Sequence, residues 1–204
     1  MTRIRAEDYD DKKQSILDRA ATLFARKGFD STTMVDVAQA CGASKSHLYH
    51  YFPAKEDLLY AIVDAHIDVM TSQLTEVMAL ALPAEERFSR FVESFVKLAA
   101  NSRDEHVVLM NDLKFLPAAR RKQVRKREAQ LVALTVALLK EMNPVLMKSV
   151  EVQAPYAMLL FGMIIWTFTW YRKTGSIGTQ ELAERISQLF VQGFKNSRPP
   201  ARGG

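Results

Sequence analysis

Apolar residues recur along most of the chain at the three- and four-residue spacing of amphipathic helices. In the first such helix, expected over about 12–27, Ile16, Ala20 and Phe24 share one face and Gly28 is a stop signal. Later helices are expected over about 55–80, 83–101, 104–115, 117–142, 151–172 and 179–194. With the two short helices described next, the pattern predicts an all-α protein of about nine helices.

The stretch 32–51, TTMVDVAQACGASKSHLYHY, predicts two short helices joined by a glycine turn. Thr33 followed three residues later by Asp36 approximates a capping box, and Ser44 is the expected cap of the second helix. Gly42 lies where a left-handed backbone conformation is needed, which a Cβ atom would penalise. This order of elements predicts a helix-turn-helix.

The second helix of this pair carries a polar face, while Leu48 points back to an apolar seam that includes Val37. Its side chains are hydrogen-bond donors, acceptors and rings, which is what a helix presents in the major groove of DNA. The candidate DNA contacts are Thr33, Ser44, Lys45, Ser46, His47, Tyr49, His50 and Tyr51. The alternative is a helical hairpin whose polar face is only hydrated.

The segment 16–59, ILDRAATLFARKGFDSTTMVDVAQACGASKSHLYHYFPAKEDLL, resembles the amino-terminal domain of TetR-family transcriptional regulators nearly position by position. The resemblance implies a homodimer, most simply a repressor, that binds a palindromic operator, with Tyr49 and Lys55 contacting backbone phosphates. The sequence departs from the family pattern at Ser46-His47, which bears on the bases read, and at Ala54, which weakens the expected cap of the next helix.

A chain of 204 residues has room for one DNA-binding domain and a second domain. We expect a helix-turn-helix domain over 1–54, an effector-binding and dimerisation domain over 55–195, and a disordered tail over 196–204. Cys41 is the only cysteine, which excludes an intramolecular disulfide, and we expect it to be a small buried residue. The charged start of the chain does not resemble a signal peptide, which predicts a cytoplasmic protein.

The net charge of +5 is concentrated outside the predicted DNA-binding domain, because Lys114–Arg127 holds seven basic residues and no acidic one. At about 100° per residue, Arg120 and Arg127 align with the apolar stripe of their helix. Arginines on such a stripe are costly to bury without an anion. The pattern predicts a cavity with an apolar floor and a cationic mouth; alternatively, the two side chains extend into water at the exposed end of the stripe.

The expected effector site combines these arginines with apolar walls, namely Phe91, Phe95, Met110, Leu113 and Trp166. The carboxy-terminal block WTFTWYRKTGSIGTQELAERISQLFVQGF resembles, more loosely, a branch of TetR regulators that control fatty-acid, phenylacetate and sterol breakdown. That resemblance implies an acyl-CoA effector, with phenylacetyl-CoA as an aromatic example. The alternatives are a CoA-free apolar effector, such as a drug, steroid or fatty acid, and a sequence-tolerant DNA-binding protein without a ligand response.

The twenty residues between Glu151 and Arg172 carry no formal charge and are long enough to span a membrane. Gln153, Pro155 and Gly162 make this segment less apolar than a typical membrane-spanning helix. We therefore expect no membrane contact, but a helix buried between the effector cavity and a second subunit. The expected dimer seam comprises Phe161, Ile165, Phe168, Ile186 and Phe190.

No nucleophile elbow, phosphate loop, dinucleotide fingerprint or zinc-protease pair occurs in the sequence. His47 and His50 lie three residues apart on one helix, but DNA contact explains them better than a shared metal, and His66 and His106 have no partner pattern. We therefore expect neither catalytic residues nor a bound metal or cofactor.

Overall fold

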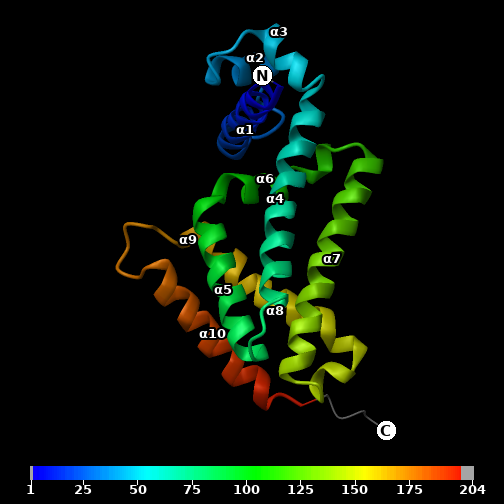
Figure 1. Ribbon diagram of the computed structural model, residues 1–204, viewed down its shortest axis with the longest axis vertical. Helices are drawn as coiled ribbons and strands as arrows, with labels where there is room; N and C mark the ends of the chain where they lie inside the picture. The colour runs from blue at the N-terminus through cyan, green and yellow to red at the C-terminus, as the bar shows by residue number, and fades with distance from the viewer. Residues whose placement is uncertain (1, 199–204) are drawn as a thin grey trace. The chain divides into compact units, whose positions relative to one another are not determined.

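The computed structural model describes residues 2–198, with side chains from Tyr9 onward, and it is helical throughout this range (Figure 1). The α-helices are α1 (Thr2–Lys27), α2 (Met34–Ala40), α3 (Lys45–Tyr51), α4 (Lys55–Met78), α5 (Ala84–Asn101), α6 (Arg103–Asp112), α7 (Ala118–Met142), α8 (Val150–Ile165), α9 (Thr167–Trp170) and α10 (Thr179–Asn196). Two 3-10 helices, η1 (Leu113–Phe115) and η2 (Leu146–Lys148), complete the described chain. The predicted all-α fold is confirmed.

Two predicted helices differ from the observed ones. α1 begins at Thr2 rather than near residue 12, because Arg3, Arg5 and Glu7 are good helix formers. The helix expected over 151–172 ends at Ile165, and α9 is a single separate turn that follows Trp166. Of the predicted tail, Asn196 still belongs to α10, and residues 199–204 lie outside the described residues.

The described chain forms two compact units. Unit 1 contains the residues up to Ile67 together with Asp104–Arg125, and unit 2 contains Asp68–Arg103 together with the residues from Lys126 onward. These units do not coincide with the predicted division at residues 54 and 55, because the first half of α4, most of α6 and the start of α7 belong to the same unit as the helix-turn-helix. As a functional division, the boundary between 54 and 55 stays a prediction.

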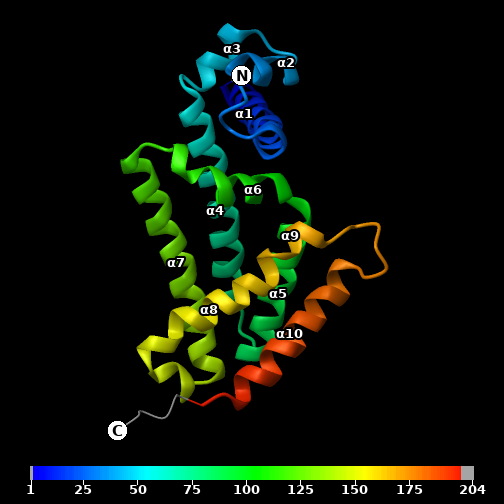
Figure 2. The same ribbon diagram turned by 180° about the vertical axis from the view of Figure 1, so that it is seen from behind.

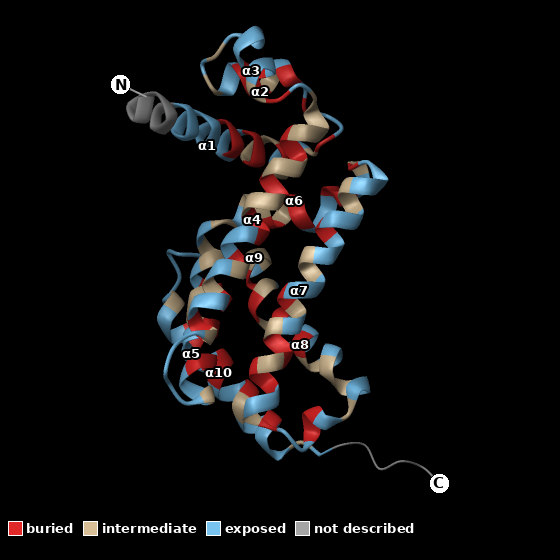
Figure 3. Cartoon of the chain, turned by 45° about the vertical axis from the view of Figure 1, so that its right-hand side comes forward, coloured by how far each residue is buried: buried red, intermediate tan, exposed pale blue. Residues whose placement is uncertain are grey.

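The core of unit 1 joins the apolar faces of α1, α2, α3 and α4 (Figure 3). Phe24 and Leu48 are almost completely buried, as the sequence pattern predicted. Phe29, just after α1, packs edge-on against Phe24 at 5.2 Å between ring centroids and stacks on Phe115 at 4.9 Å. Each such buried side chain stabilises the unit by about 1.5–3 kcal/mol, so this cluster holds the amino-terminal helices and η1 together.

The core of unit 2 is built on α5, with α10 lying alongside it (Figure 1, Figure 2). α5 is amphipathic, and Phe88, Phe91 and Phe95 recur on its buried face at helical spacing. Phe88 stacks on Phe190 of α10, and Phe91 packs edge-on against Phe161 of α8. These ring contacts fix which faces of α8 and α10 are covered inside one chain.

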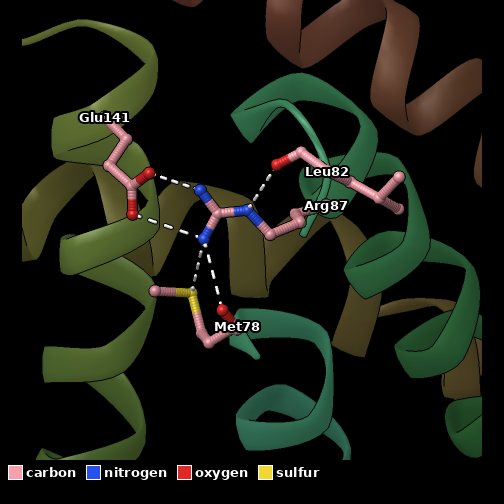
Figure 4. A network of polar contacts seen from close by, with 4 residues as sticks. All are labelled: Met78, Leu82, Arg87 and Glu141. Atoms are coloured by element: carbon pink, nitrogen blue, oxygen red, sulfur yellow. Dashed lines mark hydrogen bonds and ion pairs between the residues drawn. The ribbon is translucent and has the colours of Figure 1, made fainter. Parts of the chain in front are cut away.

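A buried arginine ties together the end of α4, the start of α5 and the end of α7 (Figure 4). The Arg87 side chain donates from Nε to the Leu82 carbonyl at 3.1 Å and from its guanidinium to the Met78 carbonyl at 3.5 Å. It also forms an ion pair with Glu141. These partners offset the desolvation of the charge, and the Arg87 side chain satisfies one carbonyl at the end of α4 and one in the connection to α5. Arg87 is therefore a structural element of unit 2.

Candidate functional site

The first helix of the helix-turn-helix, α2, is held by the predicted capping box. The Thr33 hydroxyl accepts the Asp36 N–H at 3.1 Å, and the Asp36 carboxylate accepts the Thr33 N–H at 2.8 Å. The hydroxyl of Thr33 also donates to that carboxylate and, with the backbone bond, holds the pKa of Asp36 below its usual range. The carboxylate is thus charged at neutral pH, and the start of α2 is capped as predicted.

The turn between α2 and α3 also has the predicted geometry. Gly42 has a φ of +62°, and its N–H donates to the Gln39 carbonyl at 3.0 Å. Ala43 closes the turn with a bond to the Ala38 carbonyl, and the Ser44 hydroxyl then accepts the His47 N–H at 3.2 Å. Backbone bonds and a cap therefore set the direction in which α3 leaves the turn.

The α3 helix separates an anchoring side from an exposed one. Leu48 is completely buried, whereas Lys45, Ser46, His47, Tyr49 and His50 are exposed as predicted. Tyr51 is only half-buried, and its ring stacks on Tyr9 at 4.6 Å between centroids. This contact was not predicted, because Tyr9 precedes the start that was expected for the first helix, near residue 12. Cys41 is half-buried rather than buried, and desolvation raises the pKa of its thiol. The DNA contacts themselves stay predictions.

Lys55, the predicted phosphate contact, makes two hydrogen bonds inside unit 1. Its Nζ donates to the carbonyls of Phe29 and Thr32 at 2.7 and 2.8 Å and lies 4.2 Å from the centroid of the Phe29 ring. These bonds occupy two of the three ammonium donors and satisfy two carbonyls of the α1–α2 connection. Lys55 therefore ties that connection to the start of α4, while its phosphate contact stays a prediction.

Replacing Lys55 by methionine is expected to destabilise unit 1. The substitution keeps most of the apolar stem but removes both bonds to carbonyls, so we expect a loss of about 1–3 kcal/mol. Urea unfolding followed by circular dichroism measures this change. Lys45→Met is the matched control, because Lys45 is exposed on α3 and has no carbonyl partner among the described hydrogen bonds. Equal midpoints for both variants would show that Lys55 has no structural role.

Neither compact unit by itself gathers the residues predicted to line the effector cavity. Phe91 and Phe95 are buried against each other in unit 2, with ring centroids 4.4 Å apart, whereas Trp166 of the same unit is exposed. Met110 is exposed and Leu113 is buried, and both belong to unit 1. Their shared role as cavity walls stays a prediction.

The two arginines expected at the cavity mouth are paired with carboxylates of α4. Arg120 forms an ion pair with Asp57 at 2.5 Å and lies over the Tyr60 ring, 5.1 Å from its centroid. Arg127 forms an ion pair with Asp68. Each of these half-buried arginines thus has a carboxylate of the protein itself as a partner, which offsets the cost of its burial. Their role in binding an effector stays a prediction.

Three residues of the expected dimer seam lie inside the protomer. Phe161, Ile186 and Phe190 are buried in unit 2, while Ile165 and Phe168 are half-buried. The sequence showed that α8 and α10 carry apolar residues but not which of them α5 covers. The large apolar side chains left exposed on α8, α9 and α10, or between α8 and α9, are Val150, Met158, Leu159, Trp166, Trp170 and Leu189.

The segment Val150–Trp170, whose single charged residue is Glu151, is the one stretch of the described chain that is long and apolar enough to cross a membrane, judged by length and composition alone. Its face containing Ala157, Leu160 and Ile164 is buried within unit 2, where α8 packs against α5. The predicted absence of membrane contact is not decided by this pattern and stays a prediction.

Two surface hollows lie within unit 2. One, between α5 and α10, encloses about 450 Å³ and is lined by Glu85, Ser89, Arg90, Glu93, Gln180, Ala183, Glu184, Ser187, Gln188 and Val191. The other encloses about 400 Å³ and is lined by Ala99, Ala100, Arg103, Thr167, Phe168, Tyr171, Arg172 and Lys173. Neither hollow is lined by the residues predicted for the effector site. They are therefore additional candidates for small-molecule binding.

His66 and His106 form a buried pair that the sequence did not reveal. Nε2 of His66 lies 3.3 Å from Nδ1 of His106, which joins α4 to α6 within unit 1. Burial lowers the pKa of both histidines to about 4, so both are neutral at pH 7. No group of three or more potential metal-ligating side chains occurs among the residues that the structure describes.

The chain resembles known regulators in both sequence and structure. Residues 16–62 match "Bacterial regulatory proteins, tetR family", and residues 81–194 match "Tetracyclin repressor-like, C-terminal domain". The transcriptional repressor KstR2 of Rhodococcus jostii (strain RHA1) is 24% identical over 191 residues, which cover 90% of this chain and 91% of the relative.

Solved structures extend this similarity. A TetR-family transcriptional regulator from Bordetella parapertussis 12822 is 37% identical, with a TM-score of 0.84 over 91% of this chain and 96% of its own. AibR, solved in complex with isovaleryl coenzyme A and operator DNA, is 24% identical, with a TM-score of 0.76 over 87% of this chain and 97% of its own. KstR2 and the Bordetella protein are described as a transcriptional repressor and a transcriptional regulator, respectively.

Proposed function

The chain belongs to the TetR family of bacterial transcriptional regulators, and from this premise we propose that it is a repressor released from a palindromic operator by a small-molecule effector. The observation that carries the proposal is the helix-turn-helix of unit 1. Its caps, its glycine turn and the buried Leu48 hold α3 in place, while the opposite side of α3 is exposed and polar. Such a helix suits the major groove of DNA.

We propose an acyl-CoA thioester as the effector. AibR shares the fold and was solved with isovaleryl coenzyme A and operator DNA, which supports the proposal at the level of the fold. The alternative is a CoA-free apolar effector, such as a steroid, and it is favoured by the similarity to KstR2, which is described as a ketosteroid transcriptional regulator. A phosphate-binding site would be needed only by the thioester, so it separates the two alternatives.

We propose that the repressor acts as a cytoplasmic homodimer whose subunits meet along the exposed face of α8. This face carries Met158 and Leu159, beside Pro155 and Gly162, and it has no charge along that stripe. Large exposed apolar patches mark interaction sites, and a two-fold axis would bring two copies of the stripe together. The proposed homodimer thus places Met158 and Leu159 at its interface instead of the buried residues Phe161, Ile186 and Phe190.

The effector response is proposed to pass through α4. This helix begins at Lys55 in unit 1 and ends at Met78 in unit 2, where the Met78 carbonyl accepts from Arg87. An effector can release DNA only if it binds more tightly to a dimer whose recognition helices are wrongly spaced. A continuous helix that starts near the predicted DNA contacts and is fastened in the other unit can transmit that change.

Selection of bound sequences from random DNA tests the DNA-binding proposal. We expect an enriched palindrome with half-sites about one helical turn, ~34–36 Å, apart. His47→Ala should change the preferred bases, whereas Tyr49→Phe should weaken binding to every site alike. Binding that follows salt concentration and ignores sequence would instead indicate a sequence-tolerant DNA-binding protein.

A further inference from the structure

The hollow of about 400 Å³ in unit 2 is cationic. It lies where α5 ends and α6 begins, beside α9 and the residues that follow it, and three of its eight lining residues are Arg103, Arg172 and Lys173. No acidic residue is among those that line it. A surface hollow lined by three positive charges and no negative one attracts an anion.

The three cationic side chains hydrogen-bond to neutral groups. Nε of Arg103 donates to the Phe168 carbonyl at 2.9 Å, Nζ of Lys173 to Oδ1 of Asn101 at 2.8 Å, and Arg172 to the Tyr171 carbonyl at 3.3 Å. In the described part of the chain none of the three forms an ion pair with a carboxylate. Because a guanidinium has five N–H donors and an ammonium three, each side chain retains donors for a ligand.

Other cations near candidate sites are already neutralised. Arg120 and Arg127 have aspartate partners on α4. The hollow between α5 and α10 is lined by three glutamates and only one arginine, and two of these glutamates pair with lysines: Glu85 with Lys195, and Glu93 with Lys97. An anionic ligand is therefore favoured at the hollow lined by Arg103, Arg172 and Lys173. It is disfavoured at the hollow between α5 and α10.

The size and the neutral lining of the cationic hollow suit more than an inorganic ion. Its volume lies within the range of small-molecule sites, and Ala99 and Ala100 leave space beside the aromatic rings of Phe168 and Tyr171. Aromatic side chains offer stacking surfaces for a nucleobase. We propose that this hollow binds the adenosine phosphate portion of a coenzyme A thioester, with Arg103, Arg172 and Lys173 contacting its phosphates.

This inference rests on the proposed acyl-CoA effector and names the site that recognises it. It transfers the anion-binding role from Arg120 and Arg127 to residues at the start of α6 and just after α9. Arg103 is also the last residue of unit 2 before the chain enters unit 1 at Asp104. A ligand held by Arg103 is thus one residue along the chain from the unit that contains the helix-turn-helix.

Isothermal titration calorimetry at low salt tests the site, with coenzyme A, adenosine 3′,5′-bisphosphate, pantetheine and inorganic phosphate as separate probes. The test protein carries Arg172→Ala and Lys173→Ala together. The control carries Lys140→Ala and Arg185→Ala, which also remove two exposed positive charges from unit 2. We expect the test variant to bind coenzyme A and the bisphosphate at least about tenfold more weakly than the wild type and the control. Pantetheine should bind more weakly than coenzyme A and equally to all three proteins.

Several outcomes would overturn the inference: unchanged coenzyme A affinity in the test variant, an equal loss in the control, or inorganic phosphate binding as tightly as coenzyme A. All four substituted side chains are exposed, so the variants should fold. Thermal melting curves check that they do. If the double variant is unfolded, Arg172→Gln alone replaces it, and we expect this single variant also to lose affinity for coenzyme A.

Operator release separates this inference from the proposed function. If acyl-CoA releases DNA from the wild type and equally from the test variant, the site is wrong and the effector proposal stands. If no thioester releases DNA but coenzyme A binding still depends on Arg172 and Lys173, the site stands and the effector proposal fails. Release from the wild type and the control but not from the test variant supports both.

Discussion

Replacing Phe190 with glutamate is expected to unfold unit 2 rather than to separate two subunits. Phe190 is 8% exposed, and its ring stacks on Phe88 and on Phe194 with both centroid distances at 5.3 Å. Removing a buried phenylalanine ring costs about 3–5 kcal/mol, and a carboxyl group in its place must also lose its hydration. We expect a loss of about 4 kcal/mol or more, which is large beside the ~5–15 kcal/mol that stabilise a domain.

Urea unfolding at constant protein concentration measures this loss, and Gln192→Glu is the control. Gln192 is exposed on the same helix, so the same charge there should leave the midpoint within about 0.5 kcal/mol of wild type. A Phe190→Glu protein that is a folded monomer with wild-type stability would mean that Phe190 faces a second subunit, as the sequence pattern had predicted.

Replacing Leu159 with glutamate is expected to give a folded monomer that has lost operator binding. Leu159 is 60% exposed on the uncharged face of α8, so the protomer core does not depend on it. In a symmetric dimer the substitution would place two carboxylates in one apolar interface, where burying a charge is costly. A monomer can bind only one half-site of the operator. Without the second, linked half-site contact, the affinity for the operator falls by about 100-fold or more.

Sedimentation velocity and an operator titration measure the two effects of Leu159→Glu. Val145→Glu is the matched control, because Val145 is also 60% exposed in unit 2 but lies between α7 and η2. The control should remain a dimer with wild-type affinity. A Leu159→Glu protein that sediments as a dimer would place the interface elsewhere, and one that is monomeric yet binds the operator normally would remove the need for a dimer.

The local structure of the helix-turn-helix could be read from the sequence because each of its determinants acts over a few residues. The Thr33–Asp36 box, the left-handed Gly42 and the Ser44 cap each involve partners three or four positions apart. Their geometry depends on the backbone next to them and hardly on distant helices. Even here, α1 was predicted ten residues too short, since its charged first turns have no apolar stripe to reveal them.

The candidate effector site could not be read in the same way. The pairing of Arg120 with Asp57 and of Arg127 with Asp68 joins α7 to α4, and the His66–His106 pair joins α4 to α6. Residues so far apart in sequence carry no spacing signal, so an arginine on an apolar stripe looks unpaired until its neighbour is known. The cationic hollow likewise combines residues from the end of α5 and from around α9.

The sequence by itself determined the all-α class, the helix-turn-helix with its caps and turn, and the apolar content of α8 and α10. Only the tertiary structure decided which apolar residues form the core of unit 2, with Phe161 and Phe190 inside and Leu159 exposed, and which cations keep their charge unpaired. The physical reason is that helical periodicity is a property of the local backbone, whereas burial and ion pairing depend on which distant helix covers a face, as α5 covers α10.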